Sequence, residues 1–199
     1  MIRLAFIATG TAFEDVRLPL AFTPGQPPVR AEFDALKASG ELPLGQVPIL
    51  EAGSVKVFQS KAIARYVASK TGLMGSTPEE AALVDAACET VYELREAVAA
   101  AKDDAAKAAL PAKLAGVLKA FAGVVGDGFS VGGKLSLADI LLFYFAGTGN
   151  VPTLFGPGCA DAIAACAAEP KIAAIVAKVA AIPAVAAWEE GRVARGEKF

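Results

Sequence analysis

The sequence contains no histidine and few cysteines. The absence of histidine excludes a Ser-His-Asp triad, a Cys-His pair and every metal site with a histidine ligand. The three cysteines, Cys88, Cys159 and Cys166, are odd in number and form no Cys-x-x-Cys motif, which argues against a disulfide framework or a thiolate zinc site. We therefore expect buried free thiols, no metal site and no bound cofactor.

The sequence also lacks clusters of one charge and long apolar runs. Its 19 Lys and Arg residues against 21 Asp and Glu residues give a net charge of −2, and no basic run indicates a nucleic-acid partner. The longest uncharged stretch, residues 140–160, is interrupted by GTGNVP and FGPG, so it predicts no membrane-spanning helix. The apolar run at the N-terminus is too short for a signal peptide. We expect a cytoplasmic protein without nucleic-acid or membrane partners.

Residues 1–73 mix the patterns of strands and helices. Alternating apolar residues predict a strand over 12–20 and a hairpin over 47–58 that turns at Ala52-Gly53-Ser54. Short helices are expected over 31–40 and 60–72, the second with Ser60 as its cap and Gly72 as its stop. These patterns predict a small α/β domain over residues 1–73.

From residue 77 onward the pattern is helical. Thr77 and Glu80 have the spacing of a capping box, with Pro78 at the first helical position. Ser136 and Asp139 form a second such box before a nearly all-apolar segment, which we expect to be a buried central helix. An all-α domain is therefore predicted over residues 77–199. Further helices are expected over 108–126, 160–169 and 170–182. The buried face expected for the helix after Thr77 consists of Leu83, Ala87, Val91, Leu94 and Val98.

Val47, Pro48, Gln59 and Ser60 form a candidate binding site around the predicted hairpin. A serine at a helix N-terminus lies beside free backbone N–H groups and the positive end of the helix dipole, which suits a carboxylate. The Gln59 amide offers one donor and one acceptor group, enough to read the head group of an α-amino acid. Pro48 forces Val47 to be extended, and a cis bond there would leave the Val47 backbone free to pair with an extended peptide ligand.

The stretch LGQVPILEAGSVKVFQSKAIARYVASKTGL, residues 44–73, resembles the glutathione-binding half of the soluble glutathione transferases, in particular the sigma-like group. SLADILLFYF and IPAVAAWEEG are similar to the family's helical capping motif and C-terminal helix, so the resemblance covers nearly the whole chain. It implies a thioredoxin-like domain followed by an all-helical domain, and a homodimer.

The resemblance also implies roles for individual residues. Gln59 and Ser60 would bind the γ-glutamyl group of glutathione, while Val47, before Pro48, would bind the cysteinyl backbone. Phe33 and Lys37 keep the spacing of the family's Trp-xxx-Lys pair near the glycyl end, but Phe33 lacks the indole N–H of the usual Trp. Gln46 is a further expected contact.

The family activates the glutathione thiol with a hydroxyl, usually of a Tyr at the end of the first strand. Tyr66, Tyr92 and Tyr144 all fall within later predicted helices. Residues 2–18 resemble the family's first helix and second strand, so the first strand and its Tyr are expected to be absent. Alternatively, residues 1–7 are the first strand and the first helix is lost. Neither interpretation supplies a Tyr, although Thr9 or Thr11 offers a hydroxyl.

Two functions are compatible with these residues. The first is a glutathione transferase that conjugates the glutathione thiolate to a small hydrophobic electrophile, or uses it for isomerisation or peroxide reduction, with glutathione as co-substrate. The second is a non-catalytic binding or structural protein that keeps the glutathione site without the activating hydroxyl. The catalytic residue is unknown from the sequence.

Overall fold

The first element of the structure is a helix, as one of the two interpretations of the N-terminus predicts. The computed structural model describes residues 1–23, 25–146 and 159–194. Helix α1 (Ile2–Ala8) buries Leu4 and Ala5 and has Thr9 as its C-cap, and Gly10 follows with a φ of 65°, which suits glycine. The N–H of Thr11 then donates to the carbonyl of Phe6. The alternative of a first strand over residues 1–7 is therefore wrong.

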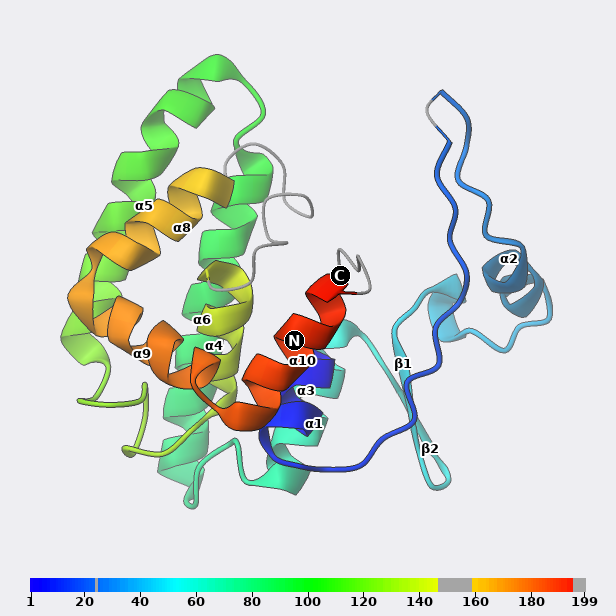
Figure 1. Cartoon of the computed structure of the whole chain (residues 1–199), viewed down its shortest axis with the longest axis horizontal. Coiled ribbons are helices and arrows are strands. Elements are labelled where there is room, and N and C mark those ends of the chain that lie inside the picture. The colour runs from blue at the N-terminus through cyan, green and yellow to red at the C-terminus, as the bar shows by residue number, and fades with distance from the viewer. Residues whose placement is uncertain (24, 147–158, 195–199) are drawn as a thin grey trace.

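The strand predicted over residues 12–20 does not form. This segment contains no strand and is mostly exposed, and its residues other than Arg17 form no backbone–backbone hydrogen bond with another described residue. It is held against α1 by the Phe13 ring, which stacks on Phe6 at 4.8 Å, and by Asp15, which bonds to Arg3 at 2.7 Å. Alternation alone predicted the strand, but a strand also needs a neighbouring strand for its hydrogen bonds. Beyond it the chain forms a projecting arm (Figure 1).

The hairpin and the helices on either side of it form as predicted. Helix α2 (Ala31–Ala38) is followed by the short 3-10 helix η1 (Pro43–Gly45). Strands β1 (Ile49–Ala52) and β2 (Val55–Phe58) pair in antiparallel fashion, with Ala52 opposite Val55. Gly53, with a φ of 61°, and Ser54 make the tight turn. Helix α3 (Ser60–Thr71) ends at Gly72 in the left-handed conformation.

Two long antiparallel helices begin the helical half. Helix α4 (Pro78–Ala100) has the predicted cap, because the N–H of Glu80 donates to Thr77 Oγ1 at 3.1 Å. Helix α5 (Asp104–Val124) is capped by Asp103 and contains Pro111. On α4 the predicted buried face is confirmed except for Leu83, whose exposed fraction is 59%. Val84, one position along, takes its place in the core.

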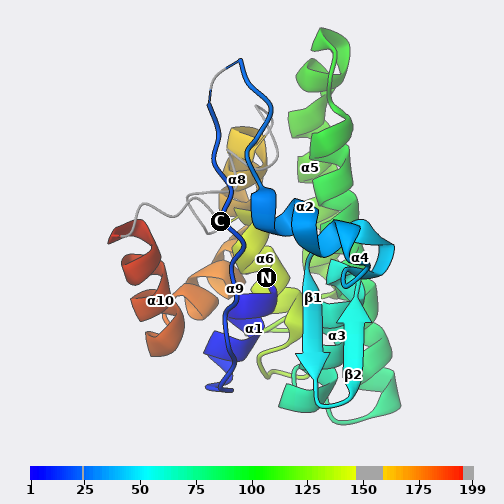
Figure 2. The same ribbon diagram turned by 90° about the vertical axis from the view of Figure 1, so that its right-hand side faces the viewer.

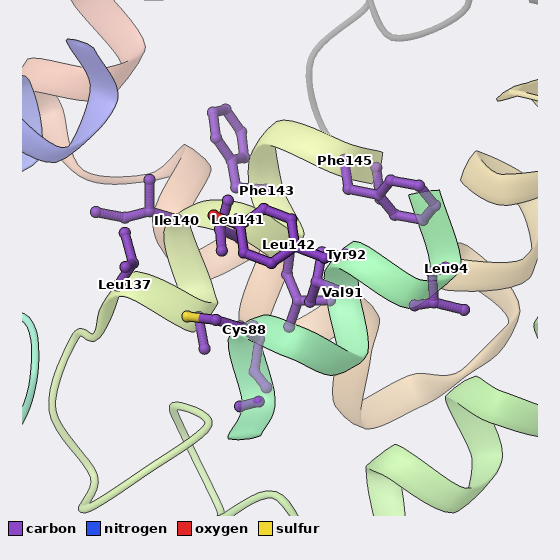
Figure 3. Packing of buried hydrophobic residues seen from close by; sticks show 14 of the residues in the cluster. Cys88, Val91, Tyr92, Leu94, Leu137, Ile140, Leu141, Leu142, Phe143 and Phe145 are labelled. Atoms are coloured by element: carbon purple, nitrogen blue, oxygen red, sulfur yellow. The ribbon is translucent and has the colours of Figure 1, made fainter. Parts of the chain in front are cut away.

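Helix α6 (Leu137–Ala146) is the buried central helix that the sequence predicts. Figure 3 shows its apolar side chains interleaved with those of α4, including Cys88, Val91 and Tyr92. Around it pack α8 (Cys159–Ala168), α9 (Pro170–Ala180) and α10 (Pro183–Ala194). The hydrophobic core is continuous with α1 and α3 of the first half, and the N–H of Leu137 donates to the carbonyl of Leu73.

The described helices differ from membrane spans in length or in composition. None of them is by itself long and apolar enough to cross a bilayer. Helix α9 and residues 183–192 of α10 have the length and composition of a span only when they are taken together, and the two are bent by 80° at the break between them. The hydrophobic core buries four apolar residues of this pair, namely Ile172, Ile175, Val179 and Val185.

Candidate functional site

A pocket lies where η1, the start of β1, the end of β2 and the start of α3 meet. Its volume is about 140 Å³. Its lining includes all four residues of the candidate binding site predicted around the hairpin, and also Gln46. The structure therefore brings these predicted residues together. The lining consists of Pro43, Leu44, Gln46, Val47, Pro48, Phe58, Gln59 and Ser60.

The junction between β2 and α3 differs in detail from the prediction. Gln59, not Ser60, is the N-cap of α3, and no side-chain bond caps the helix. Ser60 is the first helical residue because Gln59 has a φ of 70° and a ψ of 115°, which turns the chain sharply from strand into helix. The Gln59 carbonyl accepts the first helical bond, from the N–H of Ile63 at 2.9 Å. The prediction that Ser60 caps the helix is therefore wrong.

Because no side chain caps α3, the polar groups of Gln59 and Ser60 are available at the pocket. Neither the Gln59 amide nor the Ser60 hydroxyl bonds to any part of the chain that the structure describes. The N–H groups of the first turn of α3 have no partner within the helix, and the positive end of its dipole lies beside them. Together these groups can hold a carboxylate and an amino-acid head group.

Val47 supplies the backbone side of the pocket. The Val47-Pro48 bond is cis, and Val47 is half exposed, with an exposed fraction of 51%. Among the described residues, none bonds to its N–H or its carbonyl. The strand β1 begins two residues later. A peptide ligand can therefore pair with both backbone groups of Val47.

Lys37, on α2, is not among the residues that line the pocket, but its side chain lies beside Gly45, between two of them. Its side-chain stem lies across Gly45, so closely that a Cβ at Gly45 would come within 3.0 Å of Lys37 Cε. Gly45 precedes Gln46 of the lining, and the Lys37 ammonium forms no ion pair within the described ranges. The ammonium is thus free to meet a carboxylate at the rim.

Phe33 does not line the pocket. Its ring is half-buried, and the guanidinium of Arg30 lies over it at 4.9 Å in a cation–π contact. Leu44 and Phe58, by contrast, line the pocket and were missed from the sequence. Phe58 directly precedes Gln59 in the sequence, and this adjacency could have indicated that Phe58 lines the pocket. Leu44 has a φ of 58°, which a leucine rarely adopts, and no sequence signal indicated it.

The hydroxyl groups considered as thiol activators lie elsewhere among the described residues. Thr9 donates to the carbonyl of Ala5 at 2.8 Å and shares a bond of 2.9 Å with Thr11. Burial raises the pKa of Tyr92 and of Tyr144. Neither threonine nor any tyrosine is among the residues that line the pocket.

The cysteines also lie away from the pocket. Cys88 and Cys166 are free and buried, and burial raises the pKa of each thiol to about 12. The side chain of Cys159 lies outside the described part of the structure. Within that part, no group of three or more His, Cys, Asp or Glu side chains has the arrangement of a metal site. The polar groups among the residues that line the pocket are amide, hydroxyl and backbone groups.

Both halves of the chain match models of known families. Residues 1–69 match the glutathione S-transferase N-terminal domain, and residues 84–192 match the glutathione S-transferase C-terminal domain. Among curated proteins, hematopoietic prostaglandin D synthase of Gallus gallus is 32% identical over 197 residues, which cover 96% of this chain and 88% of the relative. Glutathione S-transferase S1 of Drosophila melanogaster is 31% identical over 73% of this chain and 57% of its own length.

Solved structures of glutathione S-transferases are also similar to this chain. Monomeric Na-GST-3, a glutathione S-transferase of Necator americanus, aligns with a TM-score of 0.72 and 30% identity over 96% of this chain and 90% of its own. The Pi-class glutathione S-transferase of Onchocerca volvulus aligns with a TM-score of 0.73 and 25% identity over 98% of this chain and 88% of its own.

Proposed function

This chain belongs to the glutathione S-transferase family, and from that premise we propose that it binds glutathione in the pocket between η1 and α3. It has the family's fold, a thioredoxin-like N-terminal domain followed by a helical C-terminal domain. The observation that carries the proposal is the convergence of Gln46, Val47, Pro48, Gln59 and Ser60 on one pocket.

Each end of the tripeptide has a chemical counterpart at this pocket. The γ-glutamyl carboxylate would meet the N-terminus of α3 and the Ser60 hydroxyl, and its amino group the carbonyl oxygen of the Gln59 amide. The cysteinyl backbone would pair with the free N–H and carbonyl of Val47. The glycyl carboxylate would meet the ammonium of Lys37, beside Gln46. The donors are in place in the free protein, which reduces the cost of ordering them.

The proposed reaction transfers the glutathione thiolate to a small hydrophobic electrophile. The sulfur forms a bond to the electrophilic carbon, and the leaving group departs with the displaced electron pair. Only the thiolate is a good nucleophile, and a free thiol has a pKa of about 8.5. The enzyme must therefore lower that pKa through donors or the dipole of α3. Glutathione is the co-substrate, and we propose a cytoplasmic homodimer.

A second function is favoured by one observation. In the part of the chain that the structure describes, no tyrosine or threonine hydroxyl is among the residues that line the pocket. Without a donor near the sulfur, the bound thiol keeps its ordinary pKa, and the protein binds glutathione without activating it. This alternative makes the chain a glutathione-binding protein that is not a transferase.

An ultraviolet titration of the glutathione–protein complex tests both functions. Thiolate absorbance reports the pKa of the bound thiol, and calorimetry on the same sample reports binding. A pKa well below 8.5 supports the transferase, whereas binding with an unshifted pKa supports the alternative. Absence of binding contradicts both.

A pair of serine variants shows whether the site is the one proposed. Ser60→Ala removes the pocket hydroxyl and should weaken glutathione binding roughly tenfold or more, the value of a hydrogen bond to a charged group. Ser69→Ala is the control, because Ser69 lies on the same helix and its hydroxyl donates to the carbonyl of Tyr66 at 2.7 Å, away from the pocket. Equal affinities of the two variants would place glutathione elsewhere.

A further inference from the structure

The first turn of α3 has no cap of its own. Gln59 is the N-cap residue, but among the described residues no side chain bonds to the free N–H groups of this turn. Ser60, the residue type that most often provides such a bond, lines the pocket instead. Helix ends fray when their free backbone groups lack a cap. The groups that would receive a ligand carboxylate therefore need support from elsewhere in the fold.

Lys61, the second residue of α3, is an unfavourable residue type for its position. A cation in the first turn lies close to the positive end of the helix dipole, which disfavours it. No acidic residue lies in the same turn to offset this effect. The placement of Lys61 is therefore favourable only if another element supplies the compensating charge.

Helix α4 supplies that charge. The Lys61 ammonium donates to Glu96 Oε1 at 3.4 Å and lies 3.8 Å from Glu89 Oε2. It also lies 4.2 Å from the centre of the Tyr92 ring, in a cation–π contact. Tyr92 is buried, with an exposed fraction of 3%, so its ring is a fixed surface for the ammonium. Three residues of α4 thus converge on one side chain of the first turn of α3.

A second ion pair continues this connection along α3. Arg65, one turn beyond Lys61, pairs with Asp85 at 2.5 Å and also with Glu89. Glu89 therefore joins the two cations of α3 into one network, in which each pair costs less ordering than an isolated pair. Because α3 lies between the hairpin and the helical half (Figures 1 and 2), the network connects the pocket end of α3 to α4.

We infer that Lys61 is a positioning residue for the pocket. Its contacts with α4 hold the uncapped first turn of α3 in the conformation that receives the γ-glutamyl carboxylate. This inference rests on the proposed glutathione site. Lys61 is not among the residues that line the pocket, so it acts through Ser60 and the backbone of the turn rather than by touching the ligand.

Three variants of the full chain test this role. Lys61→Met keeps the apolar stem of the side chain and removes its charge, whereas Lys61→Arg keeps the charge. Lys70→Met is the control, because Lys70 is in the last turn of the same helix and lies 5.7 Å from the Tyr66 ring, away from the pocket. Calorimetry should show glutathione affinity reduced roughly threefold or more in Lys61→Met. In the other two variants it should stay close to that of the unmodified chain.

A shorter ligand and a second site show where Lys61 acts. γ-Glutamylcysteine keeps the γ-glutamyl end and lacks the glycine, so Lys61→Met should weaken its binding by the same factor. Glu96→Gln should weaken both ligands, and combining it with Lys61→Met should add little, because the two residues act through one contact. A loss confined to glutathione would place the effect at the glycyl end and overturn the inference. Full additivity of the two substitutions would also overturn it.

Amide exchange measured by NMR on the free chain gives a readout that needs no ligand. The N–H of Ile63 closes the first turn by donating to the Gln59 carbonyl at 2.9 Å. Its exchange should be faster in Lys61→Met, while the amide of Val67 in the same helix changes little. Unchanged exchange at Ile63, or equally faster exchange in Lys70→Met, would overturn the inference. Absence of glutathione binding by the unmodified chain would contradict the proposed function instead, and the exchange result would still decide the role of Lys61 in the turn.

Discussion

The carboxylate of Asp139 accepts two hydrogen bonds from Ser130, one from the backbone N–H at 2.7 Å and one from the hydroxyl at 2.6 Å. Ser136 donates two more to the second oxygen of the same carboxylate. Asp139 is fully buried, with an exposed fraction of 0%. One side chain on α6 thus fixes both the loop before this helix and the first turn of the helix itself.

Replacing Asp139 should therefore be strongly destabilising. Asp139→Ala leaves four buried donor groups without an acceptor, and we expect the free energy of unfolding to fall by about 3 kcal/mol or more. Urea denaturation measures the change. Asp127→Ala is the control, because the Asp127 side chain is 97% exposed and only pairs with Lys171 at 3.4 Å, which predicts a loss within about 0.5 kcal/mol. Similar losses in the two variants would show that the Asp139 hydrogen bonds add little.

Substituting Gly45 should weaken glutathione binding through Lys37. Gly45 and Gly53 have the same φ of 61°, so alanine at either position should cost about 1 kcal/mol of stability. At Gly45 the new methyl group would also meet the Lys37 stem, whereas at Gly53 there is nothing within 4 Å. Calorimetry should show glutathione affinity reduced roughly tenfold in Gly45→Ala and unchanged in Gly53→Ala. An effect of the same size in both variants would exclude a role for Lys37.

The two buried thiols should make the fold sensitive to alkali. Burial raises the pKa of Cys88 and of Cys166 from the ordinary 9.0 to about 12. Between these values the unfolded chain loses the thiol protons and the folded chain keeps them. The free energy of unfolding should therefore be unaffected below pH 9 and fall as the pH rises toward 12, by up to about 1.4 kcal/mol per pH unit for each thiol.

Urea denaturation at a series of pH values checks this dependence. The double variant Cys88→Ala, Cys166→Ala should be less stable at neutral pH, because the two substitutions leave small cavities. Its stability should nevertheless decline less steeply above pH 9. The pKa values of the buried Tyr92 and the half-buried Tyr144 are also raised, so part of the decline should remain in the double variant. An identical slope in the two proteins would show that the thiols are not the cause.

The sequence predicted the elements whose signals are local. The capping box of Thr77 and Glu80 fixed the start of α4 because the bond between these two residues needs nothing from the rest of the fold. Gly10 and Gly72 marked helix ends because a left-handed residue is required there. The convergence of Val47, Pro48, Gln59 and Ser60 was also predicted, since a tight hairpin brings its two ends together.

The errors concern features that depend on distant parts of the chain. Residues 12–20 have the alternation of a strand, but the partner that would bond to them is a matter of tertiary structure. Serine is a residue type that often caps helices, but the unusual φ of Gln59 makes Gln59 the N-cap and Ser60 the first helical residue. Leu83 and Val84 are adjacent and equally apolar, and only the packing of α4 decides which of them is buried.

The hydrophobic core runs without a break from Leu4 of α1 through α3 to Val185 of α10. Helices α1 and α3 therefore owe part of their burial to the second half of the chain. Recombination between relatives would have to preserve this shared surface, so a chimera that joins residues 1–73 to a foreign helical half should fold only if the two faces are complementary. In that respect the two halves form a single packing unit.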